Sequence, residues 1–217
     1  MTTKKILLVT VLLILSEALF FNLKNAAATT RKEIVITPQI SEFDYIMRRV
    51  AAENQLDWRL LAAIGYHESR FRRDLVSSAG ARGVMQVMPG VAKSFGIDKE
   101  ELACPETNIG AAAKLIKRIE GMMKLPKSTT EEDRMKIILA SYNGGIGHVS
   151  DARRLATKLG ENNNKWDTLE KFIKLKGQPE YIEDESIRYG KFDGSETVQF
   201  VEKVMKKYDD YCKNYPI

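Results

Sequence analysis

The chain has 217 residues, with 34 Lys and Arg against 29 Asp and Glu, and a formal net charge of +5 at pH 7. So mild an excess of positive charge does not indicate a nucleic-acid-binding protein. The length is enough for one domain with a substantial core. The two cysteines, Cys104 and Cys212, have no metal-binding spacing and are weak evidence for a disulfide, so we expect no metal and no cofactor and leave their pairing open.

Residues 1–28 have the features of a cleaved secretory signal: early lysines, an apolar run at 6–15 and three alanines at 26–28. The run is too short to cross a bilayer. Without this segment, which holds three lysines and one glutamate, the formal charge falls to +3. We therefore expect an exported protein of the periplasm or cell envelope, with an extended leader at residues 29–40.

Beyond residue 40, apolar side chains recur at helical spacing almost throughout. Ser41 is expected to cap a first helix, and Asp57 a second that runs from Trp58 to about Arg70. A loop at 72–83 follows. Further helices are predicted between Pro89 and Gly96, at 106–124, at 130–142 and at 149–159.

The last part of the chain is less regular. Residues 160–195 contain polar and acidic runs, with helical spacing only at 166–174. A final helix is expected from Ser195, acting as its cap, to about Lys213. We find no strand pair and therefore predict a mainly α fold. It consists of one lobe at 41–217, with a long irregular insertion at about 160–195. This insertion forms a lid or extra substrate subsites or, more simply, decorates the surface.

A carboxylate stands in an unusual place in the stretch GYHESRF, residues 65–71. If this stretch is helical, Glu68 lies on the same stripe as Leu61 and Ile64, where desolvating a charge is costly. One explanation is an exposed helix-end glutamate paired with an arginine at 70, 72 or 73. The other is a catalytic acid whose pKa is raised by apolar surroundings.

The motifs that follow favour the catalytic acid. After ESRF come, in order, SSAGARGVMQVMP at 77–89, SYNGG at 141–145 and ETVQFV at 196–201. With these four blocks the sequence resembles the lytic transglycosylases of the soluble (SLT) type, whose catalytic domain is lysozyme-like. The resemblance covers roughly residues 45–205 apart from the insertion, and it implies a goose-type lysozyme-like lobe for residues 41–217.

The resemblance implies a role for each residue on a motif position. Glu68 falls on the single catalytic glutamate. The residues expected to bind substrate are Ser77, Met85, Gln86, Tyr142, Asn143 and Glu196. Plainer roles stay open, because Met85 could fill the core and the amides of Gln86 and Asn143 could brace the backbone. Gly144 stands where alanine is typical and is expected to loosen the turn.

The reaction that the resemblance implies needs one carboxyl group, whereas most glycosidases use two. Glu68 would protonate the bridging oxygen of peptidoglycan while the N-acetyl group of MurNAc attacks its own anomeric carbon. The resulting carboxylate would then take the proton of the sugar's 6-hydroxyl and close a 1,6-anhydro ring without water. The expected activity is that of a peptidoglycan lytic transglycosylase, a lyase, with Glu68 protonated at neutral pH.

Two alternatives stay open. A lysozyme-type muramidase, which is a hydrolase, would need a second carboxylate, for which Glu106, Asp151 and the run 183–185 are available. A non-catalytic glycan-binding protein would keep only the fold. We expect a monomer that acts on peptidoglycan glycan strands, with cell-wall or secretion-machinery proteins as further candidate partners. Exo or endo cleavage, the stem peptides that are tolerated, and wall turnover or a role in a secretion apparatus all stay open.

Overall fold

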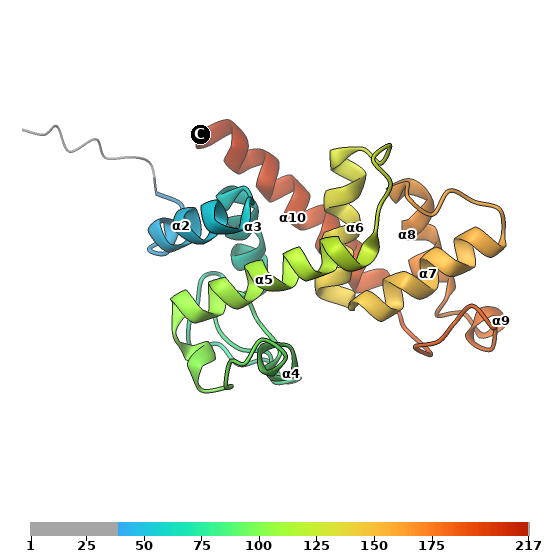
Figure 1. Ribbon diagram of the computed structural model, residues 1–217, viewed down its shortest axis with the longest axis horizontal. Helices are drawn as coiled ribbons and strands as arrows, with labels where there is room; N and C mark the ends of the chain where they lie inside the picture. The colour runs from blue at the N-terminus through green and yellow to red at the C-terminus, as the bar shows by residue number, and fades with distance from the viewer. Residues whose placement is uncertain (1–38, 217) are drawn as a thin grey trace, which may run out of the picture. The chain divides into compact units, whose positions relative to one another are not determined.

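The computed structural model describes residues 39–216; the predicted signal and nearly all of the predicted leader lie outside this part. Within it the regular secondary structure is helical, and loops join the helices (Figure 1). The helices are α2 (Asp44–Asn54), α3 (Trp58–Ser69), α4 (Pro89–Lys93), the 3-10 helix η1 (Glu101–Ala103), α5 (Pro105–Met123), α6 (Glu131–Gly144), α7 (Ile146–Lys158), α8 (Trp166–Leu175), α9 (Pro179–Ile182) and α10 (Ser195–Asn214).

The prediction of a mainly α fold is confirmed. The β-type pairing among residues 39–216 consists of two isolated bridges, which join Arg82 to Val76 and to Val87. Both bridges lie in the segment between α3 and α4, of which residues 72–83 are predicted as a loop. In the same described part, no helix combines the length and apolar character that a membrane span requires.

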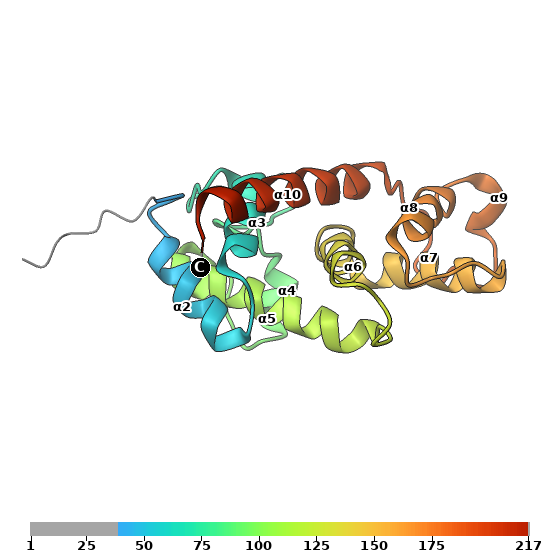
Figure 2. The same cartoon turned by 90° about the horizontal axis from the view of Figure 1, so that it is seen from above.

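Helix α3 is the centre of the core. Its residues Leu61–Ile64 are fully buried, because the helix is apolar on nearly every side. Helices α2 and α10 pack directly against it, and α10 continues across α6 (Figure 2). Helix α5 packs on α2 at one end and on α6 at the other (Figure 1). Helix α3, which carries Glu68 near its end, is therefore held by helices from both halves of the chain.

One predicted helix cap is confirmed and two are wrong. The carboxylate of Asp57 accepts the N–H of Arg59 at 2.9 Å and begins α3 as expected. Ser41 does not cap α2, which begins only at Asp44; instead, the Asp44 carboxylate accepts the Ser41 N–H at 2.8 Å. Ser195 is the first residue of α10 and not its cap. Gly194 occupies the cap position because a Cβ there would lie 2.2 Å from Ile173.

The stretch 160–195 is more regular than the sequence suggested. Helix α8 covers the part that has helical spacing and packs on α7 through a buried apolar face. Lys176, just after α8, is fully buried and pairs with the equally buried Asp151 of α7 at 3.0 Å. The expectation that this insertion merely decorates the surface is therefore wrong, because it is packed into the fold.

Candidate active site

A cavity of about 250 Å³ opens where α3, α5 and α6 meet the loop before α4. It is lined by Glu68, Ser77, Ala81, Gln86, Val87, Met88, Val91, Leu115, Tyr142 and Asn143. Three of the four sequence blocks thus meet at one place. Among the residues predicted for the site, the lining includes Glu68, Ser77, Gln86, Tyr142 and Asn143.

Glu68 is the only carboxylic acid in this lining. Its side chain is partly buried at the C-terminal end of α3, beside apolar groups of Val87 and Leu115. Burial raises the pKa of Glu68 to about 8, because a charged carboxylate loses hydration there. Most of the Glu68 carboxyl groups are therefore protonated at neutral pH.

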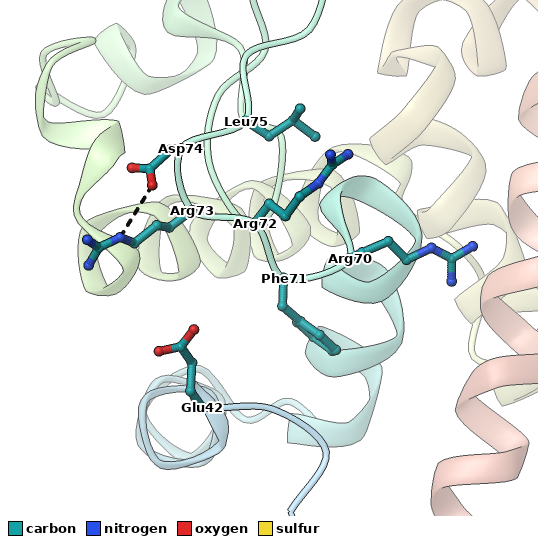
Figure 3. A pocket seen from close by; sticks show the side chains of 7 residues that line it. All are labelled: Glu42, Arg70, Phe71, Arg72, Arg73, Asp74 and Leu75. Carbon is teal, nitrogen blue, oxygen red and sulfur yellow. Dashed lines mark ion pairs between the residues drawn. The ribbon is translucent and has the colours of Figure 1, made fainter.

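The arginines that follow Glu68 do not pair with it. Their partners are the Tyr66 ring for Arg70 at 3.8 Å, the Ser69 carbonyl for Arg72 at 2.9 Å, and Asp74 for Arg73 at 3.6 Å. All three line a separate open hollow of about 820 Å³, in which their guanidinium groups point apart (Figure 3). The explanation of Glu68 as one member of a helix-end ion pair is therefore wrong.

Buried polar side chains fix the loop that carries Gln86. The Ser69 hydroxyl donates to the Val84 carbonyl at 2.8 Å. The side chain of Asn108 on α5 accepts the Met85 N–H at 2.8 Å and donates to the Arg82 carbonyl at 2.9 Å. These buried bonds have no water to replace them, so they hold the loop against the core.

Gln86 is both a wall of the cavity and a brace for its loop. Its backbone has a φ of 47°, in the left-handed region that few residues other than glycine adopt. Its Nε2 donates to the carbonyls of Leu75 at 3.1 Å and Gly83 at 2.9 Å. The Gln86 amide therefore braces the backbone of its loop, and its contact with substrate stays a prediction.

Gly83 should be the least replaceable glycine of this loop. Its φ is +76°, and a Cβ would lie 2.5 Å from Asn108 Nδ2 and 2.8 Å from the Leu102 carbonyl oxygen. We expect Gly83→Ala to lower the free energy of unfolding by roughly 3 kcal/mol. The matched control is Gly80→Ala, with a φ of +89° and open space around the Cβ, which should cost only about 1 kcal/mol. Urea unfolding of both variants checks this, and equal losses would contradict the steric argument.

Tyr142 and Asn143 bring the end of α6 to the cavity. The Tyr142 hydroxyl donates to the Met85 carbonyl at 2.7 Å. Burial, together with the nearby charge of Glu68, raises the pKa of Tyr142 well above its ordinary value, so the phenol keeps its proton at neutral pH. The amide oxygen of Asn143 accepts the hydroxyl of Thr197 at 2.8 Å. Sequence reasoning did not single out Thr197.

Two predicted site residues lie outside the cavity lining. Met85 is fully buried in the core, and its contribution to the site is a backbone carbonyl that accepts from Tyr142. Glu196 is exposed in the first turn of α10. Ser77 does line the cavity, and its hydroxyl oxygen accepts the Ala81 N–H at 2.9 Å. The predicted substrate contacts of these side chains stay predictions.

The apolar half of the wall was missed by sequence reasoning. Ala81, Val87, Met88, Val91 and Leu115 supply it. A signal was available, because Val87 and Met88 directly follow Gln86 in the motif. Within residues 39–216, no group of three or more His, Cys, Asp or Glu side chains could hold a metal ion, and both cysteines are free.

A family model described as "Transglycosylase SLT domain" matches residues 46–165. Two curated relatives are named membrane-bound lytic murein transglycosylase F. The Marinobacter nauticus protein is 36% identical over 171 residues, which cover 79% of this chain and 33% of that protein. The Shewanella loihica protein is 41% identical over 154 residues, with coverages of 71% and 31%. The chain thus spans about a third of the length of these relatives.

Solved structures of similar fold are also lytic transglycosylases. An inactive mutant of Slt from Pseudomonas aeruginosa has a TM-score of 0.55 and 22% identity, covering 87% of this chain and 26% of that one. The 70 kDa soluble enzyme of Escherichia coli has a TM-score of 0.52 and 24% identity, with coverages of 79% and 24%. These similarities agree with the lysozyme-like helical fold. Because the family model matches more than half of the chain, the protein belongs to the transglycosylase SLT domain family.

Proposed function

We propose that this protein is a peptidoglycan lytic transglycosylase that cleaves the MurNAc–GlcNAc β-1,4 bond without water and leaves 1,6-anhydro-MurNAc ends. The observation that carries the proposal is a cavity of about 250 Å³ with one carboxyl group, Glu68, whose pKa of about 8 keeps it protonated at neutral pH. The names of the relatives and the family match support the same activity. The 70 kDa soluble lytic transglycosylase has been solved with bulgecin A, so a protein of this fold binds a ligand.

In the proposed reaction, the Glu68 carboxyl group gives its proton to the bridging oxygen as the bond to the anomeric carbon breaks. The carbonyl oxygen of the sugar's own N-acetyl group forms a temporary bond to that carbon. The Glu68 carboxylate then takes the proton of the 6-hydroxyl, whose oxygen displaces the N-acetyl group. One residue acts first as acid and then as base, and its proton is restored at the end.

The cavity supports this route better than hydrolysis with two carboxylates. Four of the five acids considered for a second carboxylate, all but Glu183, form ion pairs elsewhere. Glu106 pairs with Arg49 on the surface, Asp151 with the buried Lys176, and both Asp184 and Glu185 with Lys158. None of them lines the cavity that holds Glu68. A retaining or inverting glycosidase needs its second carboxyl group within about 10 Å of the first.

We further propose the periplasm or cell envelope as the place of action and peptidoglycan glycan strands as the macromolecular partner, with the described residues acting as a monomer. The word "membrane-bound" in the relatives' names supports an envelope location. The partly apolar wall suits the sugar rings and N-acetyl methyl groups of such strands.

Digestion of purified sacculi in water enriched in heavy oxygen tests the proposal. We expect muropeptides with anhydro ends, each lighter by one water than the hydrolysis product, and no heavy oxygen in them. A muramidase would give reducing ends that carry the heavy isotope. A glycan-binding protein without activity would release nothing, and either of these results would refute the proposed reaction.

A further inference from the structure

The first turn of α10 contacts the cavity lining through a hydrogen bond from Thr197 to Asn143. We propose that Thr197 is a positioning residue that turns the Asn143 amide so that its NH₂ group, and not its oxygen, is offered to the sugar in the cavity. This inference rests on the proposed function and deepens it. It concerns a residue beyond 46–165, the part that the family model matches.

The first support is the hydrogen-bond requirement of Thr197. The residue is only 2% exposed, and a buried hydroxyl group must donate its hydrogen to some acceptor. Within the described residues, the acceptor of the Thr197 hydroxyl is Asn143 Oδ1, at 2.8 Å. The amide of Asn143 has an oxygen that accepts and an NH₂ group that donates. Because the oxygen faces the Thr197 hydroxyl, the NH₂ group must face away from Thr197. Asn143 itself is exposed and lines the cavity, so that end is accessible to a ligand.

The second support is how closely α10 is brought to this turn. A Cβ on Gly144 would lie 2.7 Å from Thr197 Oγ1 and 2.8 Å from Phe192 Cζ. The expectation that Gly144 loosens the turn is therefore wrong, since the missing side chain allows tight packing. A looser contact would let the Asn143 amide rotate, and its NH₂ group would no longer be held in one orientation.

The third support is the anchoring of the segment behind the contact. The ring of Phe192 stacks on that of His148 at 4.3 Å and 8°. His148 Nδ1 lies 2.8 Å from the buried Lys176, which pairs with Asp151. The segment that leads into α10 is thus fixed to α7 by a partly buried ring stack that rests on a buried ion pair, and Thr197 has little freedom to leave Asn143. Such support from outside the cavity is what holds a binding group in one orientation.

The chemistry identifies what the amide would meet. An NH₂ group donates to hydroxyl or carbonyl oxygens, and amino sugars of glycan strands carry both. The Asn143 side chain reaches the same cavity as Glu68, so the acceptor belongs to a sugar bound beside the bond to be cleaved. A hydrogen bond of this kind contributes about 1 kcal/mol net, more when its loss leaves a partner unsatisfied.

The test compares Thr197→Val, which keeps the shape and removes the donor, with Thr197→Ser, which keeps the donor. On sacculi we expect Thr197→Val to lose about tenfold in kcat/KM and Thr197→Ser to stay within about threefold of the wild type. The decisive readout is the same Val substitution in an Asn143→Ala background, where it should have no further effect. A purely structural role of Thr197 would lower activity equally in both backgrounds and overturn the inference, as would full activity of Thr197→Val.

A wild-type protein that cleaves no sacculi would refute the proposed function and not this inference. In that case, binding of a β-1,4-linked N-acetylglucosamine tetramer, measured by calorimetry, takes the place of kcat/KM. Thr197→Val should then weaken binding about tenfold in the Asn143 background and not at all in the Asn143→Ala background. Equal affinities for the wild type and Thr197→Val would overturn the inference.

Discussion

Glu68→Gln is expected to abolish glycan cleavage and, above about pH 5, to make the protein more stable than the wild type. Gln has nearly the shape of the protonated acid but can neither give nor take the proton, and positioned proton transfer contributes about 10²–10⁴-fold to such reactions. Activity on sacculi should therefore fall below detection while binding of glycan strands persists. In the wild type, activity should decline as the pH rises through about 8, where Glu68 loses its proton.

The stability gain follows from the same pKa. The folded chain raises the pKa of Glu68 from 4.5 to about 8, so between these values the folded state binds more protons than the unfolded state. The wild-type free energy of unfolding therefore falls as the pH rises through this window, and the Gln variant lacks this fall. The difference between them should grow to roughly 2–4 kcal/mol by pH 8 and then stay constant.

Urea unfolding from pH 4.5 to 9 measures this difference. The control is Glu202→Gln, which removes a carboxylate from an exposed position on α10 and should change the free energy of unfolding by less than about 0.5 kcal/mol. A Glu68→Gln variant whose stability follows the wild type at every pH would contradict the raised pKa. Substantial turnover by that variant would contradict the catalytic role. The stability measurement thus tests the raised pKa of Glu68, and the turnover measurement tests its catalytic role.

The sequence predicted the polar half of the cavity because each motif carries its own local structure. Asp57 begins α3 with a side-chain cap, which fixes the helix that carries Glu68. The Tyr142–Asn143 pair ends α6 at a glycine-rich turn. Such signals are local, so they can be read without knowledge of the packing.

The contact of Thr197 with Asn143 shows where local signals were insufficient. Helix α10 buries Val198, Val201 and Val204, and Thr197 lies on the same face, four residues before Val201. Glu196 falls outside this stripe and is exposed. The helical phase of α10 was visible in the sequence and could have identified Thr197. The helical phase could not show that Thr197 contacts Asn143, because Asn143 belongs to another helix.

Met85 illustrates a different limit. It lies in a loop without a periodic pattern, so no stripe of apolar residues indicates which side faces the core. The loop turns it under α3, where its Sδ would lie 3.3 Å from a Cβ on Gly65. Only the tertiary fold decides that this side chain is buried while Gln86 beside it faces the cavity. The burial of Lys176 in a polar stretch was equally invisible, because long charged side chains are nearly always exposed.

The buried pair of Asp151 and Lys176 is expected to be the polar site behind Thr197 at which substitutions lower the stability most. Asp151 accepts from Lys176 Nζ at 3.0 Å and from the backbone N–H groups of Arg188 at 3.0 Å and Tyr189 at 2.9 Å. It also accepts from Arg154. Burial alone would raise the pKa of Asp151, but the donors of Arg188, Lys176 and Tyr189 hold the pKa below its ordinary value, so the carboxylate is charged at neutral pH.

Asp151→Leu should therefore lower the free energy of unfolding by about 3–5 kcal/mol, because it leaves Lys176 buried without a counter-charge. Lys176→Met should cost less, about 1–2 kcal/mol, since Asp151 keeps its other donors. The double variant removes both charges and should be more stable than the sum of the two losses predicts. Urea unfolding followed by circular dichroism measures all three. Strictly additive losses would mean that the two side chains do not interact.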